Sequence, residues 1–180
     1  MLQHVLESAL RQTMNRLVRP VLNPAVPVPL QRRIVRQAYR SSTPPRGAKF
    51  ENITIGGVPA TRTTFGNDPR GAVLYLHGGG YIIGSSSTHR GITGHLAKTT
   101  GCAIVTPDYR LAPEFPFPAA LDDAEACWNG LLEAGLKPDQ IAVAGDSAGG
   151  GLSVALAMRL RDKGLQLPAS LTAFSPWIDL

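Results

Sequence analysis

The chain has 180 residues, of which 43% are hydrophobic and 17% are charged, and its formal net charge is +5. This length and apolar content predict one globular domain with a hydrophobic core, and they exclude a wholly disordered chain. No apolar run reaches the length that a bilayer requires, so we expect no membrane span.

Positive charge is concentrated in the first 50 residues, where nine basic residues accompany the single acid Glu7. We expect no nucleic-acid partner, because no aromatic residues interleave this charge and no binding motif accompanies it. The first residues also lack the continuous apolar core and small-residue cleavage site of a secretory signal. The arginine content leaves a mitochondrial presequence open, although the proline-rich stretch that follows favours a structural role.

Two segments of this basic region have apolar residues at helical spacing, 6–18 and 29–40, and the proline-rich hinge RPVLNPAVPVP separates them. We predict two amphipathic helices whose arginines form solvated outer faces. A helix lying on a membrane surface is the alternative. The apolar faces would consist of Leu6, Leu10, Met14 and Leu17 in the first helix and Leu30, Ile34 and Ala38 in the second.

Two cysteines occur, Cys102 in a strand-like run and Cys127 in a helix-like run. Neither has metal-ligating residues at a recognisable spacing, so we expect no metal site. Buried free thiols in a reducing compartment are the default for such residues, and this favours the cytoplasm.

From residue 50 onward the pattern changes to strands and then to alternating strands and helices. A hairpin is expected from strands at 50–55 and 58–65, and the apolar run at 72–76 is typical of a strand buried on both faces. Helices follow at 88–99, 119–133 and 148–160, with strands at 102–106, 141–144 and 171–175. This alternation predicts an α/β fold, with a mostly parallel sheet flanked by helices and ligands at the carboxyl ends of its strands.

The stretch IAVAGDSAGGGL at 141–152 predicts a strand, a sharp turn and a helix, with Ser147 at the apex of a G-x-S-x-G motif. A side chain at Gly145 or Gly149 would collide with the neighbouring strand or helix. The strained turn would expose the Ser147 hydroxyl, and the backbone N–H of Ala148 would be available to an oxyanion. Ser147 is therefore a candidate nucleophile.

A second glycine-rich motif, HGGG at 77–80, follows the buried strand at 72–76. Consecutive glycines allow backbone amides to approach a ligand, so Gly79 and Gly80 could join Ala148 in an oxyanion hole. One such donor is worth about 3 kcal/mol in the transition state. The motif alone could equally be a flexible turn, but its place at a strand end upstream of G-x-S-x-G favours the oxyanion hole.

HGGG, together with YRLAPE at 109–114, FPAALDD at 117–123 and GDSAGG at 145–150, resembles the motifs of the bacterial hormone-sensitive-lipase-like esterases. The resemblance covers essentially the whole chain. It implies an α/β-hydrolase core at 46–180 with N-terminal cap helices at 1–45, and a carboxylesterase-type serine hydrolase that acts on short or medium acyl esters without a cofactor. It also implies site roles: Ser147 as nucleophile, Gly79, Gly80 and Ala148 as oxyanion donors, His77 as support for the glycine loop, and Tyr81 in the substrate pocket.

Other polar residues have simpler interpretations. We expect Asp108, Arg110 and Glu114 to form a hydrogen-bonded scaffold for the loop after the strand at 102–106, because charged groups at buried strand ends need partners. Acids are favoured at a helix start, which accounts for Asp122 and Asp123. The remaining histidines are expected on a helix surface, in capping roles or away from the site, namely His4, His89 and His95.

The sequence departs from the family where the triad should be completed. The family places an acid and a histidine after the nucleophile, whereas here no histidine follows Ser147 and, after Asp162 close to the end of the nucleophile's helix, the only acid is Asp179. We do not expect Asp179 to be the triad acid, because it belongs to the loop after the last strand. The sequence is therefore expected to be the N-terminal part of an esterase, lacking the C-terminal strands and impaired in turnover.

Two further expectations follow from this departure. The strand at 171–175, which begins at Leu171 and ends at Ser175, would form an exposed apolar edge through which chains self-associate. The alternative to an enzyme is a binding or assembly module on the same fold, because the plant gibberellin receptors resemble this family and lack its catalytic histidine.

Overall fold

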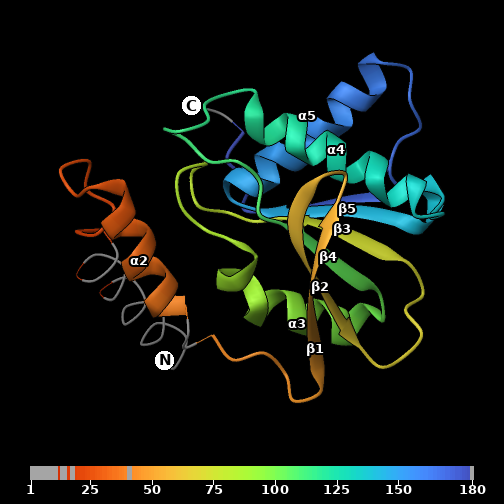
Figure 1. Cartoon of the computed structure of the whole chain (residues 1–180), viewed down its shortest axis with the longest axis horizontal. Coiled ribbons are helices and arrows are strands. Elements are labelled where there is room, and N and C mark those ends of the chain that lie inside the picture. Colours follow the sequence, from red (N-terminus) through yellow and green to blue (C-terminus); the bar gives the residue numbers. More distant parts are fainter. Residues whose placement is uncertain (1–11, 13–15, 17–18, 40–41, 179–180) are drawn as a thin grey trace, which may run out of the picture.

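The computed structural model describes residues 12, 16, 19–39 and 42–178. Within them the chain forms a six-stranded sheet in the order β1-β2-β4-β3-β5-β6 (Figure 1). The first two strands form the predicted hairpin and β2 joins β4 antiparallel, whereas the pairs β4-β3, β3-β5 and β5-β6 are parallel. The strands are β1 (Ala48–Ile55), β2 (Val58–Phe65), β3 (Ala72–Leu76), β4 (Ala103–Pro107), β5 (Ile141–Asp146) and β6 (Ser170–Phe174).

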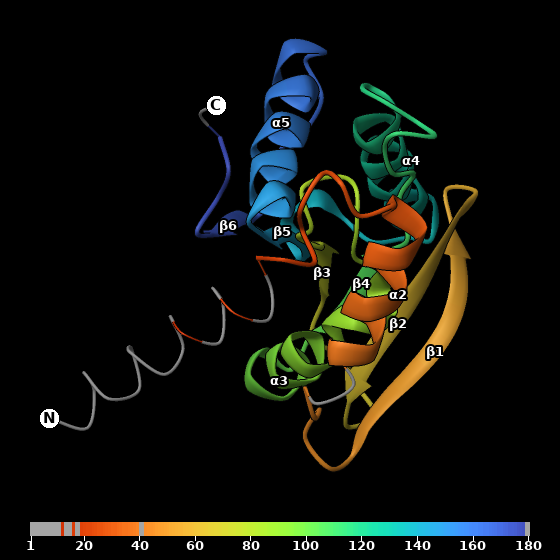
Figure 2. The same ribbon diagram turned by 90° about the vertical axis from the view of Figure 1, so that its left-hand side faces the viewer.

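Helices cover both faces of this sheet, which confirms the expected α/β architecture. On one face lie α4 (Ala119–Glu133) and α5 (Ala148–Asp162), and on the other lies α3 (Arg90–Thr100) (Figure 1). The predicted helix at 88–99 is divided, because a short 3-10 turn, η3 (Ser86–His89), precedes α3; a second such turn, η4 (Pro138–Gln140), precedes β5. The helix α2 (Val28–Ala38) lies to one side of these layers in Figure 1 and in front of the sheet in Figure 2.

Burial on both faces of the sheet explains why β3 consists of aliphatic residues and one tyrosine. Leu74 and Leu76 pack on the α4–α5 side, whereas Val73 and Tyr75 pack on the α3 side. All five residues of β3 are buried. A strand covered on both faces is stabilised by apolar side chains at every position, each worth about 1.5–3 kcal/mol when fully buried.

At the other end of the sheet, β6 pairs only with β5 among the described residues, so the expected edge strand is confirmed within them. Leu171 and Phe174 are each 38% exposed, and Trp177 and Ile178 beyond the strand are more exposed still. No helix in the described part of the chain is both long enough and apolar enough to cross a membrane.

The N-terminal predictions are partly confirmed. The second helix exists as α2, but its expected inner face was wrong: Leu30 and Ile34 are exposed, whereas Gln31 is buried and donates hydrogen bonds to the carbonyls of Val26 and Asn23. Helical spacing marks an apolar stripe without showing which neighbour the helix meets, and here the inner face meets the backbone of the proline-rich hinge. The first predicted helix falls largely outside the described residues.

Candidate active site

The predicted strand–turn–helix around Ser147 is present. Ser147 stands between β5 and α5 with φ 51° and ψ −121°, a conformation that is strained for a residue with a side chain. Neighbouring backbone holds it there: the Ser147 amide donates to the Phe174 carbonyl at 2.9 Å, and its carbonyl accepts from the Trp177 amide at 2.9 Å. The turn leaves the Ser147 side chain exposed.

The glycines that flank this turn are required by close packing, as predicted. A Cβ added at Gly145 would lie 2.3 Å from the Gly149 carbonyl oxygen, and one added at Gly149 would lie 2.0 Å from the Leu76 carbonyl oxygen. Both separations are far below van der Waals contact. The absence of side chains therefore lets the turn approach the end of β3, where the HGGG motif begins.

The glycine loop after β3 folds back on itself. The amides of Ile82 and Ile83 both donate to the Gly79 carbonyl, at 3.1 and 3.0 Å, and Gly79 and Gly80 have φ values of 129° and 61°. In the described part of the chain, the amides of Gly79, Gly80 and Ala148 donate to no protein group. Within the described residues these three amides therefore have no hydrogen-bond acceptor.

Ser147, Gly79 and Gly80 line one cavity of about 410 Å³ between α2 and the glycine loop. Ala148 is buried behind Ser147 and does not line it. The remaining walls combine apolar side chains from the hinge, α2 and the loop with polar side chains and two glycines: Leu22, Gln31, Val35, Tyr39, Gly78, Ile82, Ile83, Gly84, Thr88, His89 and Asp146.

Tyr81 lines a different cavity from Ser147. Its side chain packs against the core cluster between α4 and α5 and lines a second cavity, of about 240 Å³, with Phe115 and Leu152 among its walls. The positive φ of 62° at Tyr81 turns the backbone, and the ring lies 6.3 Å from that of Trp177. Tyr81 therefore does not line the cavity that Ser147 lines, and its place in a substrate pocket stays a prediction.

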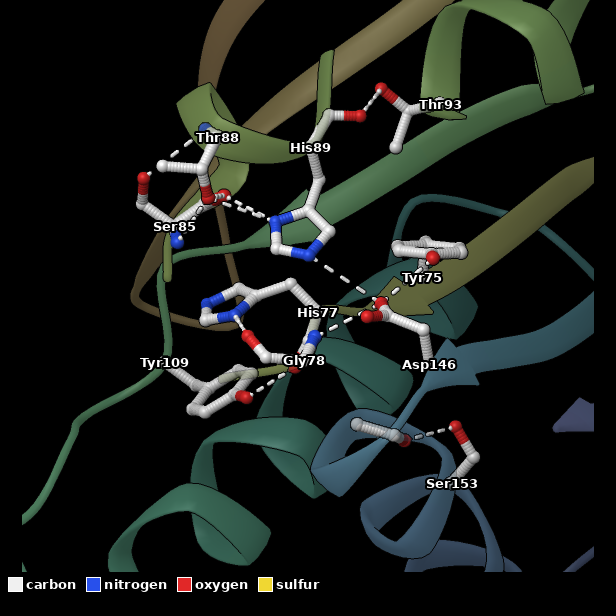
Figure 3. A network of polar contacts seen from close by, with 11 residues as sticks. Tyr75, His77, Gly78, Ser85, Thr88, His89, Thr93, Tyr109, Asp146 and Ser153 are labelled. Carbon is white, nitrogen blue, oxygen red and sulfur yellow. Dashed lines mark hydrogen bonds and ion pairs between the residues drawn. The ribbon is translucent and has the colours of Figure 1, made fainter. Parts of the chain in front are cut away.

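Sequence reasoning missed Asp146, which ties the two glycine motifs together (Figure 3). Its carboxylate accepts hydrogen bonds from the Tyr75 hydroxyl at 2.8 Å and the Gly78 amide at 3.0 Å, and it lies 3.5 Å from His89 Nε2. Burial alone raises the pKa of Asp146, but the hydrogen bonds and the neighbouring His89 outweigh it and hold the pKa below its ordinary value. The available signal was a carboxylate at a buried strand end, which needs partners.

His77 sits beneath the glycine loop and is fully buried. Its Nδ1 lies 2.9 Å from the Gly78 carbonyl oxygen, its ring stacks on Tyr109 at 4.2 Å, and the Tyr109 hydroxyl donates to the His77 carbonyl. Burial, reinforced by His89, lowers the pKa of His77 to about 4. A neutral imidazole that donates to Gly78 suits the supporting role that the resemblance implies.

His89 was expected on a helix surface or in a capping role, and the surface position is wrong. It ends η3 and is only 6% exposed, its Nδ1 lies 2.9 Å from the Thr88 hydroxyl, and Nε2 faces Asp146 (Figure 3). It occupies the N-cap position of α3, but its side chain makes no capping hydrogen bond. Both ring nitrogens therefore have partners other than Ser147. His95 is exposed on α3, as expected.

The expected loop scaffold exists, but its members bond to neighbouring elements instead of to one another. Asp108 accepts from the amide and hydroxyl of Ser86, at 2.6 and 3.0 Å. Arg110 pairs with Asp123 of α4 at 2.7 Å, so Asp123 does more than complement the helix dipole. Among the described residues, no group of three or more His, Cys, Asp or Glu side chains could hold a metal ion.

The third member, Glu114, pairs with Arg32 of α2 at 2.7 Å. This contact corrects the expectation that the arginines of α2 are all solvated, because the Arg32 side chain is only 25% exposed. Its partner is distant in sequence, so helical spacing could not reveal it.

Comparison with known proteins agrees with this geometry. A family model described as the alpha/beta hydrolase fold matches residues 73–180. An acetyl-hydrolase of Streptomyces hygroscopicus is 44% identical over 128 residues, which are 71% of this chain and 43% of the relative. The esterase LipU of Mycobacterium tuberculosis is 38% identical over 173 residues, which are 91% of this chain and 57% of the relative.

Among solved structures, the crystal structure of an esterase from the bacterial hormone-sensitive lipase family matches with a TM-score of 0.86 at 40% identity. The match covers 94% of this chain and 58% of that chain, so this chain spans about half the length of the relatives it matches. The sequence motifs, the sheet and the turn at Ser147 agree with these matches: the chain belongs to the α/β-hydrolase fold family, among the bacterial hormone-sensitive-lipase-like esterases.

Proposed function

We propose that this chain carries the nucleophile and oxyanion hole of a carboxylesterase-type serine hydrolase that acts on short or medium acyl esters. The observation that carries the proposal is the exposed Ser147 hydroxyl on a strained turn, in the cavity lined by Gly79 and Gly80. Attack by Oγ on the ester carbonyl would form a tetrahedral oxyanion that accepts hydrogen bonds from these glycine amides and from Ala148. Loss of the alcohol leaves an acyl-enzyme, which water hydrolyses.

Turnover requires a base within about 3 Å of the serine oxygen. His77 is buried beneath the loop, and the ring nitrogens of His89 lie against Thr88 and Asp146. We therefore propose that the acid and base come from outside the described residues, and that the 180-residue chain alone is impaired. Loss of a triad histidine costs about 10⁶ in kcat and leaves roughly 10³–10⁴ over the uncatalysed rate.

Hydrolysis of p-nitrophenyl acetate by the purified chain and by Ser147→Ala tests both parts. We expect slow hydrolysis that disappears in the variant. Equal rates in the two proteins would remove Ser147 as nucleophile and favour the alternative, a binding module on this fold. A kcat in the ordinary range of about 1–10³ s⁻¹ would instead show that a base is supplied within the chain.

Self-association through β6 is a further part of the proposal, supported by the exposed Leu171 and Phe174 on an edge strand. Light scattering should show oligomers at micromolar concentration that Leu171→Lys weakens, and a stable wild-type monomer would contradict this. The two free thiols, Cys102 and Cys127, support a reducing compartment such as the cytoplasm.

A further inference from the structure

The loop that carries the free glycine amides is strained. Gly79, Gly80 and Tyr81 are consecutive residues with positive φ, and Tyr81 has a side chain, for which φ 62° is unfavourable. Positive φ is unstrained for the two glycines, whereas at Tyr81 it is unfavourable and persists only where the surroundings impose it. The glycines have no side chains with which to anchor the loop. Its shape therefore depends on contacts made to its backbone from outside.

Such contacts exist at both ends of the loop. On the side nearer β3, Asp146 accepts a hydrogen bond from the Gly78 amide at 3.0 Å. On the far side, Arg32 Nε donates to the Ile82 carbonyl at 2.8 Å. The amide of Ile82 donates to the Gly79 carbonyl, so the hydrogen bond from Arg32 to Ile82 also restrains the backbone turn that contains the Gly79 and Gly80 amides.

Arg32 also ties this turn to the loop after β4. Its Nη2 donates to the Ala112 carbonyl at 2.9 Å, and the Ala112 amide donates to the Tyr81 carbonyl at 2.8 Å. Glu114 accepts two hydrogen bonds from the guanidinium, at 2.9 and 2.7 Å, and this pairing lowers the pKa of Glu114. The planar guanidinium can donate to the two carbonyls and to the carboxylate at the same time, whereas a lysine ammonium on a flexible side chain cannot reproduce this donor geometry.

We infer that Arg32 is a positioning residue: from the cap helix α2 it holds the turn at 79–83 in the shape that directs the Gly79 and Gly80 amides into the cavity. The helix that forms one wall of the cavity thus also sets the alignment of the oxyanion donors. The catalytic consequence rests on the proposed function, because it requires the turn to act as an oxyanion hole. The structural consequence, a turn held by Arg32, does not.

Hydrogen exchange tests the structural consequence without any enzymatic activity. In Arg32→Gln, the peptide that spans the amides of Ile82 and Ile83 should exchange about 10-fold faster than in wild type, because the turn opens more readily. Arg33→Gln is the matched control, since Arg33 is an exposed neighbour on the same helix and the charge change is identical. Unchanged exchange in folded Arg32→Gln would overturn the inference.

Kinetics tests the catalytic consequence, using the Ser147-dependent hydrolysis of p-nitrophenyl acetate. Displaced oxyanion donors should lower kcat by about 10–100-fold while KM changes by less than about 2-fold, and Arg32→Lys should restore little. A rise in KM with unchanged kcat would show that Arg32 only places the cavity wall, and would refute the positioning role. If wild type shows no Ser147-dependent hydrolysis, the proposed function fails, and hydrogen exchange alone decides whether Arg32 holds the turn.

Discussion

Lowering the pH should destabilise the protein through His77. This histidine is fully buried, and burial lowers its pKa to about 4, whereas an unfolded histidine has a pKa of about 6.5. Between these values the unfolded state binds a proton that the folded state does not. The free energy of unfolding should therefore be highest above about pH 6.5 and fall by about 3 kcal/mol as the pH drops to about 4.

Urea unfolding at intervals between pH 7 and 4.5 measures this change. The charged neighbour Asp146 has a lowered pKa, so its own contribution is lost at more acid pH, below about 4. His77→Gln removes the titrating group and should flatten the profile, whereas the exposed His95→Gln should keep the wild-type slope. A flat wild-type profile, or an unchanged slope in His77→Gln, would refute the assignment of this buried neutral imidazole.

Gly149→Ala should lower the free energy of unfolding by about 2 kcal/mol or more, because the new methyl group would lie 2.0 Å from the Leu76 carbonyl oxygen. Urea unfolding measures this change, and a stability equal to wild type would contradict the packing of α5 against β3. Burial, together with a nearby aspartate, raises the pKa of the Cys127 thiol to about 12, so Ellman's reagent should modify Cys102 in the folded protein and Cys127 only after unfolding. Tyr75→Phe should lower the free energy of unfolding by about 1–2 kcal/mol, because it removes the hydroxyl that donates to the partly buried Asp146 carboxylate at 2.8 Å. An unchanged thermal midpoint would argue against that hydrogen bond.

The strained turn at Ser147 was predictable because its determinants are local. An apolar strand, two glycines around Ser147 and a helical run define the geometry within a dozen residues, and the bounds of β2, β3 and α4 agree with the sequence-based ranges for the same reason. The steric role assigned to Gly145 and Gly149 also follows from the local motif.

The electrostatic environment of the site was not predictable, because its contacts join distant segments. The hydrogen bond between Asp146 and Tyr75 joins residues 71 positions apart in the sequence, and the one between Arg32 and Glu114 joins residues 82 positions apart. Periodicity identified α2 but assigned Leu30 to the wrong face, since spacing does not show which neighbour a helix meets. Contacts of this kind depend on how the elements pack, and a single sequence carries no direct signal for them.

Reaction with a fluorophosphonate probe, followed by peptide mapping, tests the central claim that Ser147 is a nucleophile facing an oxyanion hole. The probe's phosphoryl oxygen would occupy the position of the oxyanion, so the account predicts one adduct, on Ser147, that forms slowly and is absent in Ser147→Ala. Folded protein that gives no adduct at high probe concentration, or an adduct on another residue that persists in Ser147→Ala, would contradict it.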